Sequence, residues 1–191
     1  MDSTGSQAPR IRRGDRTAVV VVDVLNDYEH PDGERLRESA EKVVPVIERV
    51  LARARDADVP VIWVNDNHGQ WSAGRPELVE SARAGAGAAL IDPVAPNDDA
   101  PFVVKSRHSI FYGSHLEYLL ETEEIGRLVL VGQVTEQCIL YSALDGYIRH
   151  FRVAVPRDAV AHIDSELADA ALTMMERNMR AEIVAADDLE L

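Results

Sequence analysis

The chain lacks the features of a secreted or membrane protein. Cys138 is the only cysteine among 191 residues, which excludes an intrachain disulfide. No apolar run approaches the roughly 20 residues needed to cross a bilayer. Residues 1–16 lack the apolar segment of a signal peptide, and we interpret them as a flexible N-terminal arm. These absences predict a cytoplasmic protein with no membrane partner.

Positive charge and nucleotide-binding motifs are also scarce. The chain has 20 Lys and Arg against 33 Asp and Glu, a formal net charge of −13. A body this acidic repels phosphate backbones, so no nucleic-acid partner is expected. No G-x-G-x-x-G follows the first predicted strand and no G-x-x-x-x-G-K-[ST] occurs, which argues against a nucleotide-binding domain.

What the chain does have is a regular alternation of strand and helix patterns. Hydrophobic residues make up 46% of it, which is typical of a globular protein, and the length suits one domain over residues 17–191. Runs that are apolar throughout predict strands covered on both faces, as in a parallel sheet. The predicted strands are Thr17–Val24, Pro60–Asn65, Arg127–Gly132 and Arg152–Pro156, with weaker candidates at Phe102–Lys105 and Ala181–Ala185.

Apolar residues at helical spacing lie between these runs, for example over 43–54, where Pro45 predicts a late start or a bend. The alternation predicts an α/β protein with an open parallel sheet, strand order 3-2-1-4-5-6, and helices on both faces. In such sheets the ligand lies beyond the carboxyl ends of the strands.

Three chemically active residues follow predicted strand ends. Asp23 closes the first strand, where desolvation makes a carboxylate a better base, although an Asp there also braces a turn. Lys105 ends the third, where a lysine is more often an ordinary strand-end residue. Cys138 follows the fourth strand in the first turn of the next helix, if Thr135 is the N-cap.

The position of Cys138 has two interpretations. The helix dipole and free N–H groups there stabilise a thiolate and lower the thiol pKa, and they also accept an oxyanion. Alternatively, Cys138 is a small buried hydrophobe. Because a parallel sheet brings strand ends to one edge, an acid, a cation and a thiol together predict an activated nucleophile.

Three segments resemble the isochorismatase-like cysteine hydrolase family. They are VVVVDVLNDY at 19–28, VVKSRHSIFYGSHLEYLL at 103–120 and LVLVGQVTEQCILYSALDGYIRHFRVAVPRDAVA at 128–161. The resemblance implies a six-stranded parallel sheet, a catalytic triad of Asp23, Lys105 and Cys138, and a cis peptide bond between Val134 and Thr135. It also implies an oxyanion hole formed by the main-chain N–H groups of Thr135 and Cys138.

The function predicted on this basis is hydrolysis of a small carboxamide through a thioester, without a cofactor. Two alternatives stay open: vinyl ether hydrolysis of the isochorismatase type, and a non-catalytic redox-sensing or scaffold domain. The resemblance also implies a homo-oligomer.

Some residues depart from the family pattern. Leu25 stands where many relatives have Gln, and Tyr28 where they have Phe. Asp66 and His68 match the start of a nicotinamidase-like metal site, but no further histidine follows before Lys105, so we predict no metal. Proximity to the three segments suggests further substrate-binding residues: Asn26, Tyr28, Asn65, Trp71, Arg107, Phe111, Tyr112 and Tyr141.

Overall fold

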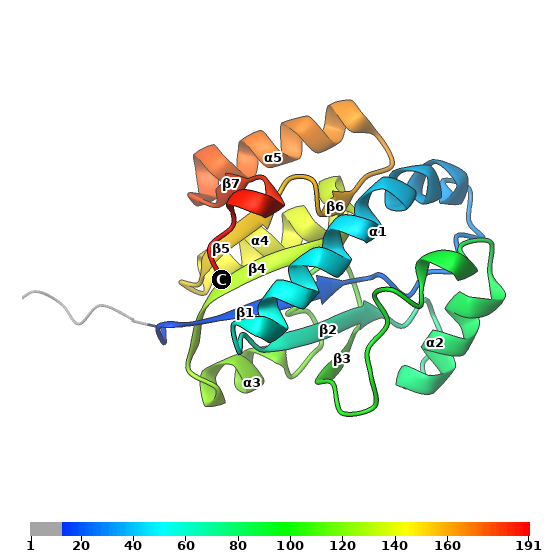
Figure 1. Cartoon of the computed structure of the whole chain (residues 1–191), viewed down its shortest axis with the longest axis horizontal. Coiled ribbons are helices and arrows are strands. Elements are labelled where there is room, and N and C mark those ends of the chain that lie inside the picture. Colours follow the sequence, from blue (N-terminus) through cyan, green and yellow to red (C-terminus); the bar gives the residue numbers. More distant parts are fainter. Residues whose placement is uncertain (1–12) are drawn as a thin grey trace, which may run out of the picture.

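Seven parallel strands form one sheet at the centre of the computed structural model, which describes residues 13–191 (Figure 1). The strands are β1 (Arg16–Val22), β2 (Val61–Asp66), β3 (Phe102–Lys105), β4 (Ile125–Gln133), β5 (Arg152–Pro156), β6 (Val160–Ala161) and β7 (Glu182–Val184). The principal order is β3-β2-β1-β4-β5-β7, which confirms the predicted order. The additional strand β6 pairs with the end of β4; its two residues are too few to show a periodic pattern.

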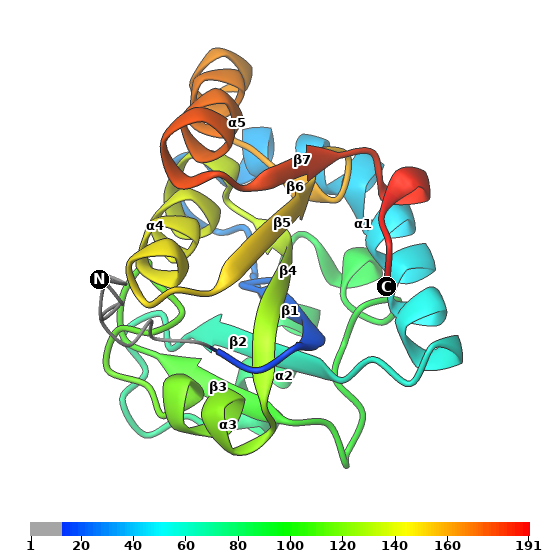
Figure 2. The same cartoon turned by 90° about the vertical axis from the view of Figure 1, so that its left-hand side faces the viewer.

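Five α-helices cover the two faces of the sheet. They are α1 (Gly33–Asp56), α2 (Arg75–Ala84), α3 (Leu116–Thr122), α4 (Leu140–Ile148) and α5 (Ser165–Met179). Buried side chains of α1 and α2 belong to the cluster on one face, and those of α3, α4 and α5 to the cluster on the other. Figure 2 shows α1 on the opposite side of the strands from α3, α4 and α5. Short 3-10 turns at Ala88–Leu90 and Ala186–Asp188 and a π-helical turn at Thr135–Ile139 complete the elements.

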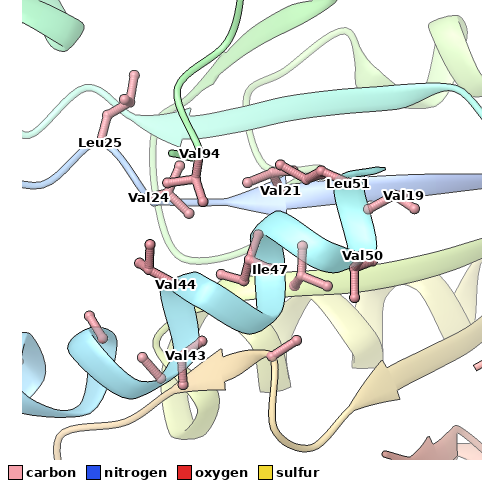
Figure 3. Close-up of a cluster of buried hydrophobic side chains, with 14 of the residues drawn as sticks. Val19, Val21, Val24, Leu25, Val43, Val44, Ile47, Val50, Leu51 and Val94 are labelled. Carbon is pink, nitrogen blue, oxygen red and sulfur yellow. The ribbon is translucent and has the colours of Figure 1, made fainter. Parts of the chain in front are cut away.

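Both faces of β1 are buried because the strand lies in the middle of the sheet. Val19 and Val21 pack toward α1, where Figure 3 shows them beside Ile47, Val50 and Leu51. Ala18, Val20 and Val22 belong to the opposite cluster. Burial of each such aliphatic side chain stabilises the fold by about 1.5–3 kcal/mol, and this continuous apolarity gave the strand its sequence signal.

Helix α1 begins ten residues before the predicted start at residue 43 and passes through Pro45. Leu36 and Ala40 continue its buried stripe toward the N-terminus. Pro45 is on the solvent side of the helix, where water can bind the carbonyl group that the proline leaves without an N–H partner. The expected late start was therefore wrong.

The predicted N-terminal arm falls largely on residues 1–12, which lie outside the described residues. Arg13 is packed against the domain: its guanidinium pairs with Glu117 and Glu121 and lies 4.4 Å from the centre of the Phe151 ring. Strand β1 begins at Arg16. Among residues 13–191, no helix combines the length and apolar character needed to cross a membrane.

Candidate active site

The strand register brings Asp23, Lys105 and Cys138 to one edge of the sheet. Val22 is level with Val64 of β2 and with Gly132 of β4, and Lys105 is level with Asp66. Lys105 Nζ lies 2.9 Å from Asp23 Oδ2 and 3.7 Å from Cys138 Sγ. The three residues predicted from separate strand ends are therefore neighbours.

Gly132 allows the central strands to approach closely at this edge. Its φ is +118°, and a Cβ atom on it would lie 2.1 Å from the carbonyl oxygen of Val22. Only glycine fits there without displacing β1 or β4. The position of Val22, directly before Asp23, and the path of β4 toward Cys138 therefore depend on a glycine at residue 132.

Asp23 is fixed by hydrogen bonds to its side chain and its backbone. Its Oδ1 accepts the backbone N–H of Asp66 at 2.7 Å, and its carbonyl oxygen accepts Gln133 Nε2 at 2.7 Å. Its φ is +54°, a left-handed conformation that Asp tolerates better than most residues. These contacts leave Oδ2 directed to Lys105.

Lys105 is fully buried between two carboxylates. Asp66 Oδ2 lies 3.2 Å from Nζ, on the ammonium group that also contacts Asp23. Burial alone would lower the pKa of Lys105, but Asp23, Cys138 and Asp66 together raise it above its ordinary value. Burial alone would raise the pKa of Asp66, but Lys105 and the His68 backbone N–H lower the pKa of that carboxyl below its ordinary value. Lys105 is therefore a permanent cation at the floor of the site.

The pKa of the Cys138 thiol differs from the value expected from the sequence. Cys138 lies in the π-helical turn that leads into α4, with Val134 rather than Thr135 at the N-cap. Burial raises the pKa of the Cys138 thiol, and the Asp23 carboxylate raises it further, against the opposing effect of Lys105. The prediction that this pKa would be lowered was wrong, because desolvation and the neighbouring Asp23 carboxylate outweigh the lowering effects of Lys105 and the Val134 backbone.

The cis peptide bond lies one residue earlier than predicted. It joins Gln133 to Val134, so the predicted bond between Val134 and Thr135 was wrong. The bond falls where β4 ends at Gln133, before the helical turn starts at Thr135. The Val134 carbonyl oxygen accepts the N–H groups of Gln137 and Ile139, and neither bond uses the amide of Cys138. The Thr135 hydroxyl donates to the Ala161 carbonyl at 2.9 Å and so ties the turn to β6.

A pocket of about 410 Å³ opens above Cys138. Its walls come from the segment between β1 and α1, from the start of α1, from the end of β2 and the residues after it, from the junction between β4 and α4, and from the segment between β6 and α5. The lining residues are Asp23, Asn26, His30, Asp32, Leu36, Asp66, His68, Gln133, Val134, Gln137, Cys138 and Ile163. Of the predicted substrate-binding residues, Asn26 is the one that lines this pocket.

Two of the other predicted binding residues support the site from behind. Asn65 is buried: its Oδ1 accepts the Leu25 N–H at 2.9 Å and its Nδ2 donates to the Leu25 carbonyl at 3.1 Å. Tyr28 is also buried and donates its hydroxyl to Gln133 Oε1 at 3.2 Å. Both hold the loop after β1 and do not line the pocket.

The remaining predicted binding residues do not line the pocket either. Phe111 is in the core, stacked on Phe151 with ring centres 5.8 Å apart. Trp71 and Tyr112 are 78% and 60% exposed, and Arg107 is also exposed. Proximity in sequence to a motif was a poor guide here, because the loops around these residues turn their side chains into the core or the solvent.

His108 is the functional candidate that the sequence analysis missed. Its Nδ1 lies 3.8 Å from Cys138 Sγ, and its ring is tilted against Tyr141 with centres 5.4 Å apart. Tyr141 is therefore linked to Cys138 by its contact with His108. The signal was the place of His108 three residues after Lys105, but irregular loops carry no periodicity that predicts where a side chain points.

Asp66 and His68 are engaged in contacts that do not suit a metal site. Asp66 binds Lys105 and the His68 backbone N–H, and His68 Nε2 lies 3.1 Å from the Leu25 carbonyl oxygen. Among residues 13–191, no group of three or more His, Cys, Asp and Glu side chains is arranged to hold a metal ion. A cation at Asp66 would have to compete with the ammonium of Lys105, so these residues do not fit the metal site of the nicotinamidase-like pattern.

A family model described as the isochorismatase domain matches residues 17–188. The chain belongs to the isochorismatase family. An uncharacterized isochorismatase family protein of Bacillus subtilis, YaaI, is 32% identical, with the alignment covering 90% of this chain and 95% of that protein.

Solved structures agree with this assignment. A cysteine hydrolase from Pseudomonas syringae pv. phaseolicola superposes with a TM-score of 0.74 at 25% identity, covering 91% of this chain and 90% of the other. An N-carbamoylsarcosine amidase from Thermoplasma acidophilum gives 0.68 at 27% identity, covering 92% and 99%. The resemblance inferred from the sequence is confirmed, and membership in this group supports a hydrolase of the amidohydrolase type.

Proposed function

We propose that the protein is a cysteine-dependent amidohydrolase that cleaves the C–N bond of a small carboxamide through a thioester intermediate. The observation that carries the proposal is the placement of Lys105 Nζ, 2.9 Å from Asp23 Oδ2 and 3.7 Å from Cys138 Sγ, below an open pocket. A base, a cation and a nucleophile in contact are the components of an acyl-transfer site.

The first half of the reaction begins with proton transfer from the Cys138 thiol to Asp23. The raised pKa of the thiol supports this order, because a sulfur that stays protonated at rest needs an adjacent base when the substrate arrives. Lys105 stabilises the thiolate by its charge. Sγ then attacks the carboxamide carbon, an S–C bond forms, and the carbonyl electron pair moves to oxygen.

The oxyanion needs donors at the start of the helical turn. The main-chain N–H groups of Thr135 and Cys138 are at this position, and Thr135 lies in the first turn after the N-cap. The N–H groups of a helix's first turn have no partners within the helix, so they are free to bind an anion. In other enzymes, removal of one oxyanion-hole donor costs about 2.7–4 kcal/mol of transition-state stabilisation.

The first half ends when the oxyanion re-forms the carbonyl group and the C–N bond breaks. Asp23 gives its proton to the leaving nitrogen, ammonia or an amine departs, and a thioester remains. The second half returns the enzyme to its starting state. Asp23 next accepts a proton from water, whose oxygen attacks the thioester carbon. The S–C bond breaks, the carboxylic acid leaves, and the sulfur recovers its proton from Asp23. No electron is gained or lost, so the scheme uses no redox cofactor.

The direct test is ammonia release from a panel of carboxamides by the purified protein. Cys138→Ala is expected to reduce turnover to background, and Asp23→Asn to reduce it about 10²–10⁴-fold, with circular dichroism confirming that both variants are folded. Ser142 is buried one helical turn away, and Ser142→Ala controls for the loss of a buried polar atom near the site. Full activity in Cys138→Ala would refute the scheme.

The same preparation distinguishes the alternatives. Pyruvate release from isochorismate without ammonia release from any amide would favour vinyl ether hydrolysis. Reversible oxidation of Cys138 without either product would favour a redox-sensing domain. Cytoplasmic location and a homo-oligomer stay predictions, and sedimentation of the purified chain tests the second.

A further inference from the structure

The charged side chains that line the pocket above Cys138 are all carboxylates. Its lining includes the carboxylates of Asp23, Asp32 and Asp66, and within residues 13–191 no Arg or Lys side chain lines it. The nearest cation, Lys105, is fully buried beneath the floor and bound to two of these carboxylates. A substrate in the pocket therefore meets no free positive side chain.

The charges do not balance. The formal charges of three carboxylates and one ammonium leave two negative charges around the space where the substrate binds. The pKa shifts of Asp66 and Lys105 keep both of these groups ionised over the physiological range. A carboxylate on the substrate would be repelled in a partly desolvated cleft, where charges interact more strongly than in water.

Asp32 is the carboxylate that no internal contact uses. It stands at the N-cap of α1, but its side chain accepts no hydrogen bond from the helix. It is exposed at the pocket wall and is not involved in a salt bridge within the described residues. Its charge is therefore available to a ligand.

The helix ends at the pocket do not reverse this sign. The N-termini of α1 and of the turn that leads into α4 each carry the equivalent of about half a positive charge, and together these are smaller than the excess of negative charge in the lining. The N–H groups of the second end are those proposed to bind the amide oxygen. Asp32 is the residue at the α1 end, so its carboxylate offsets the dipole there. The remaining lining residues carry amide, imidazole, thiol and aliphatic side chains.

We propose that this site selects amides that are positively charged or neutral and rejects amides that carry a carboxylate. The inference deepens the proposed function and rests on it for the reaction, but the charge preference has its own readout. Because Cys138 is the only cysteine, thiol-specific reagents of different charge report the potential at the sulfur without any substrate.

The first measurement is the rate of Cys138 modification by aminoethyl and sulfonatoethyl methanethiosulfonate, followed by mass spectrometry. Each rate is divided by the rate for 2-mercaptoethanol, a neutral thiol, under the same conditions, which removes the intrinsic reactivity of each reagent. We expect the normalised rate of the cationic reagent to exceed that of the anionic reagent by at least about tenfold at low salt, and the ratio to shrink at high salt.

A matched pair of variants assigns the effect to the pocket. Asp32→Asn should lower the ratio about three- to fivefold, within the range of a single partly exposed charge. Glu48→Gln removes the same charge from an exposed position sixteen residues further along α1, about 24 Å away, and should leave the ratio unchanged. A normalised ratio of one or less in the wild type would overturn the inference, as would equal effects of the two variants.

The second measurement uses three nearly isosteric amides: β-alaninamide, butyramide and succinamate, which end in an ammonium, a methyl and a carboxylate group. Ammonia release should be fastest with one of the first two and slowest with succinamate. Faster turnover of succinamate would overturn the charge preference and leave the amidase proposal standing. Selective modification by the cationic reagent, with no ammonia from these or any other carboxamides, would contradict the amidase proposal and leave the charge preference standing.

Discussion

Replacement of Lys105 by methionine tests the electrostatic core of the site. Methionine keeps an unbranched apolar stem of similar shape but leaves the carboxylates of Asp23 and Asp66 without their cation. Removal of one partner from a buried ion pair costs about 3–5 kcal/mol. Asp23 is 7% exposed, but Asp66 is 25% exposed and partly screened. We therefore expect a loss of about 3–4 kcal/mol in the free energy of unfolding.

Urea denaturation followed by circular dichroism measures this loss. With a slope of about 2–3 kcal/mol per molar urea, the midpoint should fall by roughly 1–2 M. Lys42→Met removes a lysine from an exposed position on α1 and should change stability by less than about 0.5 kcal/mol. The double variant Asp23→Asn with Lys105→Met should recover part of the loss, because one of the stranded charges is gone. A Lys105→Met midpoint equal to that of the wild type would show that the pair is not a buried ion pair in solution.

Three further predictions concern other parts of the same edge. Burial raises the pKa of Tyr28 from 10.0 to about 12. Its neutral hydroxyl therefore contributes stability below pH 10, and this contribution is lost as the pH rises toward 12. Between about pH 9 and pH 11 the urea midpoint should fall more in the wild type than in Tyr28→Phe. Gly132→Ala places a methyl group against the Val22 carbonyl and should cost about 2–4 kcal/mol in a thermal melt. The lowered pKa of Asp66 stabilises the fold above its ordinary value of 3.8, and this contribution is lost as the pH falls through the lowered pKa; Asp66→Asn should thus be less acid-sensitive than the wild type.

Each of these has a contrary result. If the urea midpoints of the wild type and Tyr28→Phe fell equally as the pH rises, the pKa of the Tyr28 hydroxyl would not be raised by burial. An unchanged melting temperature in Gly132→Ala would mean that the central strands are further apart than the structure has them. Equal acid sensitivity of the wild type and Asp66→Asn would mean that folding does not lower the pKa of Asp66.

The sequence predicted the sheet well because burial leaves a strong trace in composition. Val19–Val22 and Leu128–Val131 are covered on both faces, so their runs are apolar without interruption, and a parallel order then brings Asp23, Lys105 and Cys138 together. The family resemblance supported the same three residues. The two-residue β6 left no such trace.

What the sequence did not predict depends on where side chains point in irregular segments. His108 and Phe111 lie three residues apart in one loop, yet His108 reaches the sulfur and Phe111 enters the core. The protonation of Cys138 also depends on tertiary contacts, since burial and Asp23 raise the pKa of its thiol. The cis bond before Val134 lies at the junction between β4 and the following turn, which periodicity does not describe.

The amide side chain of Asn65 acts as a peptide group for the residue beyond β1. It accepts the Leu25 N–H and donates to the Leu25 carbonyl, as a neighbouring strand would. Sheet-like pairing thus extends past the last strand residue and into the loop that lines the pocket above Cys138. The Leu25 end of this loop is thereby tied to β2, the same strand whose last residue, Asp66, donates its backbone N–H to the Asp23 carboxylate.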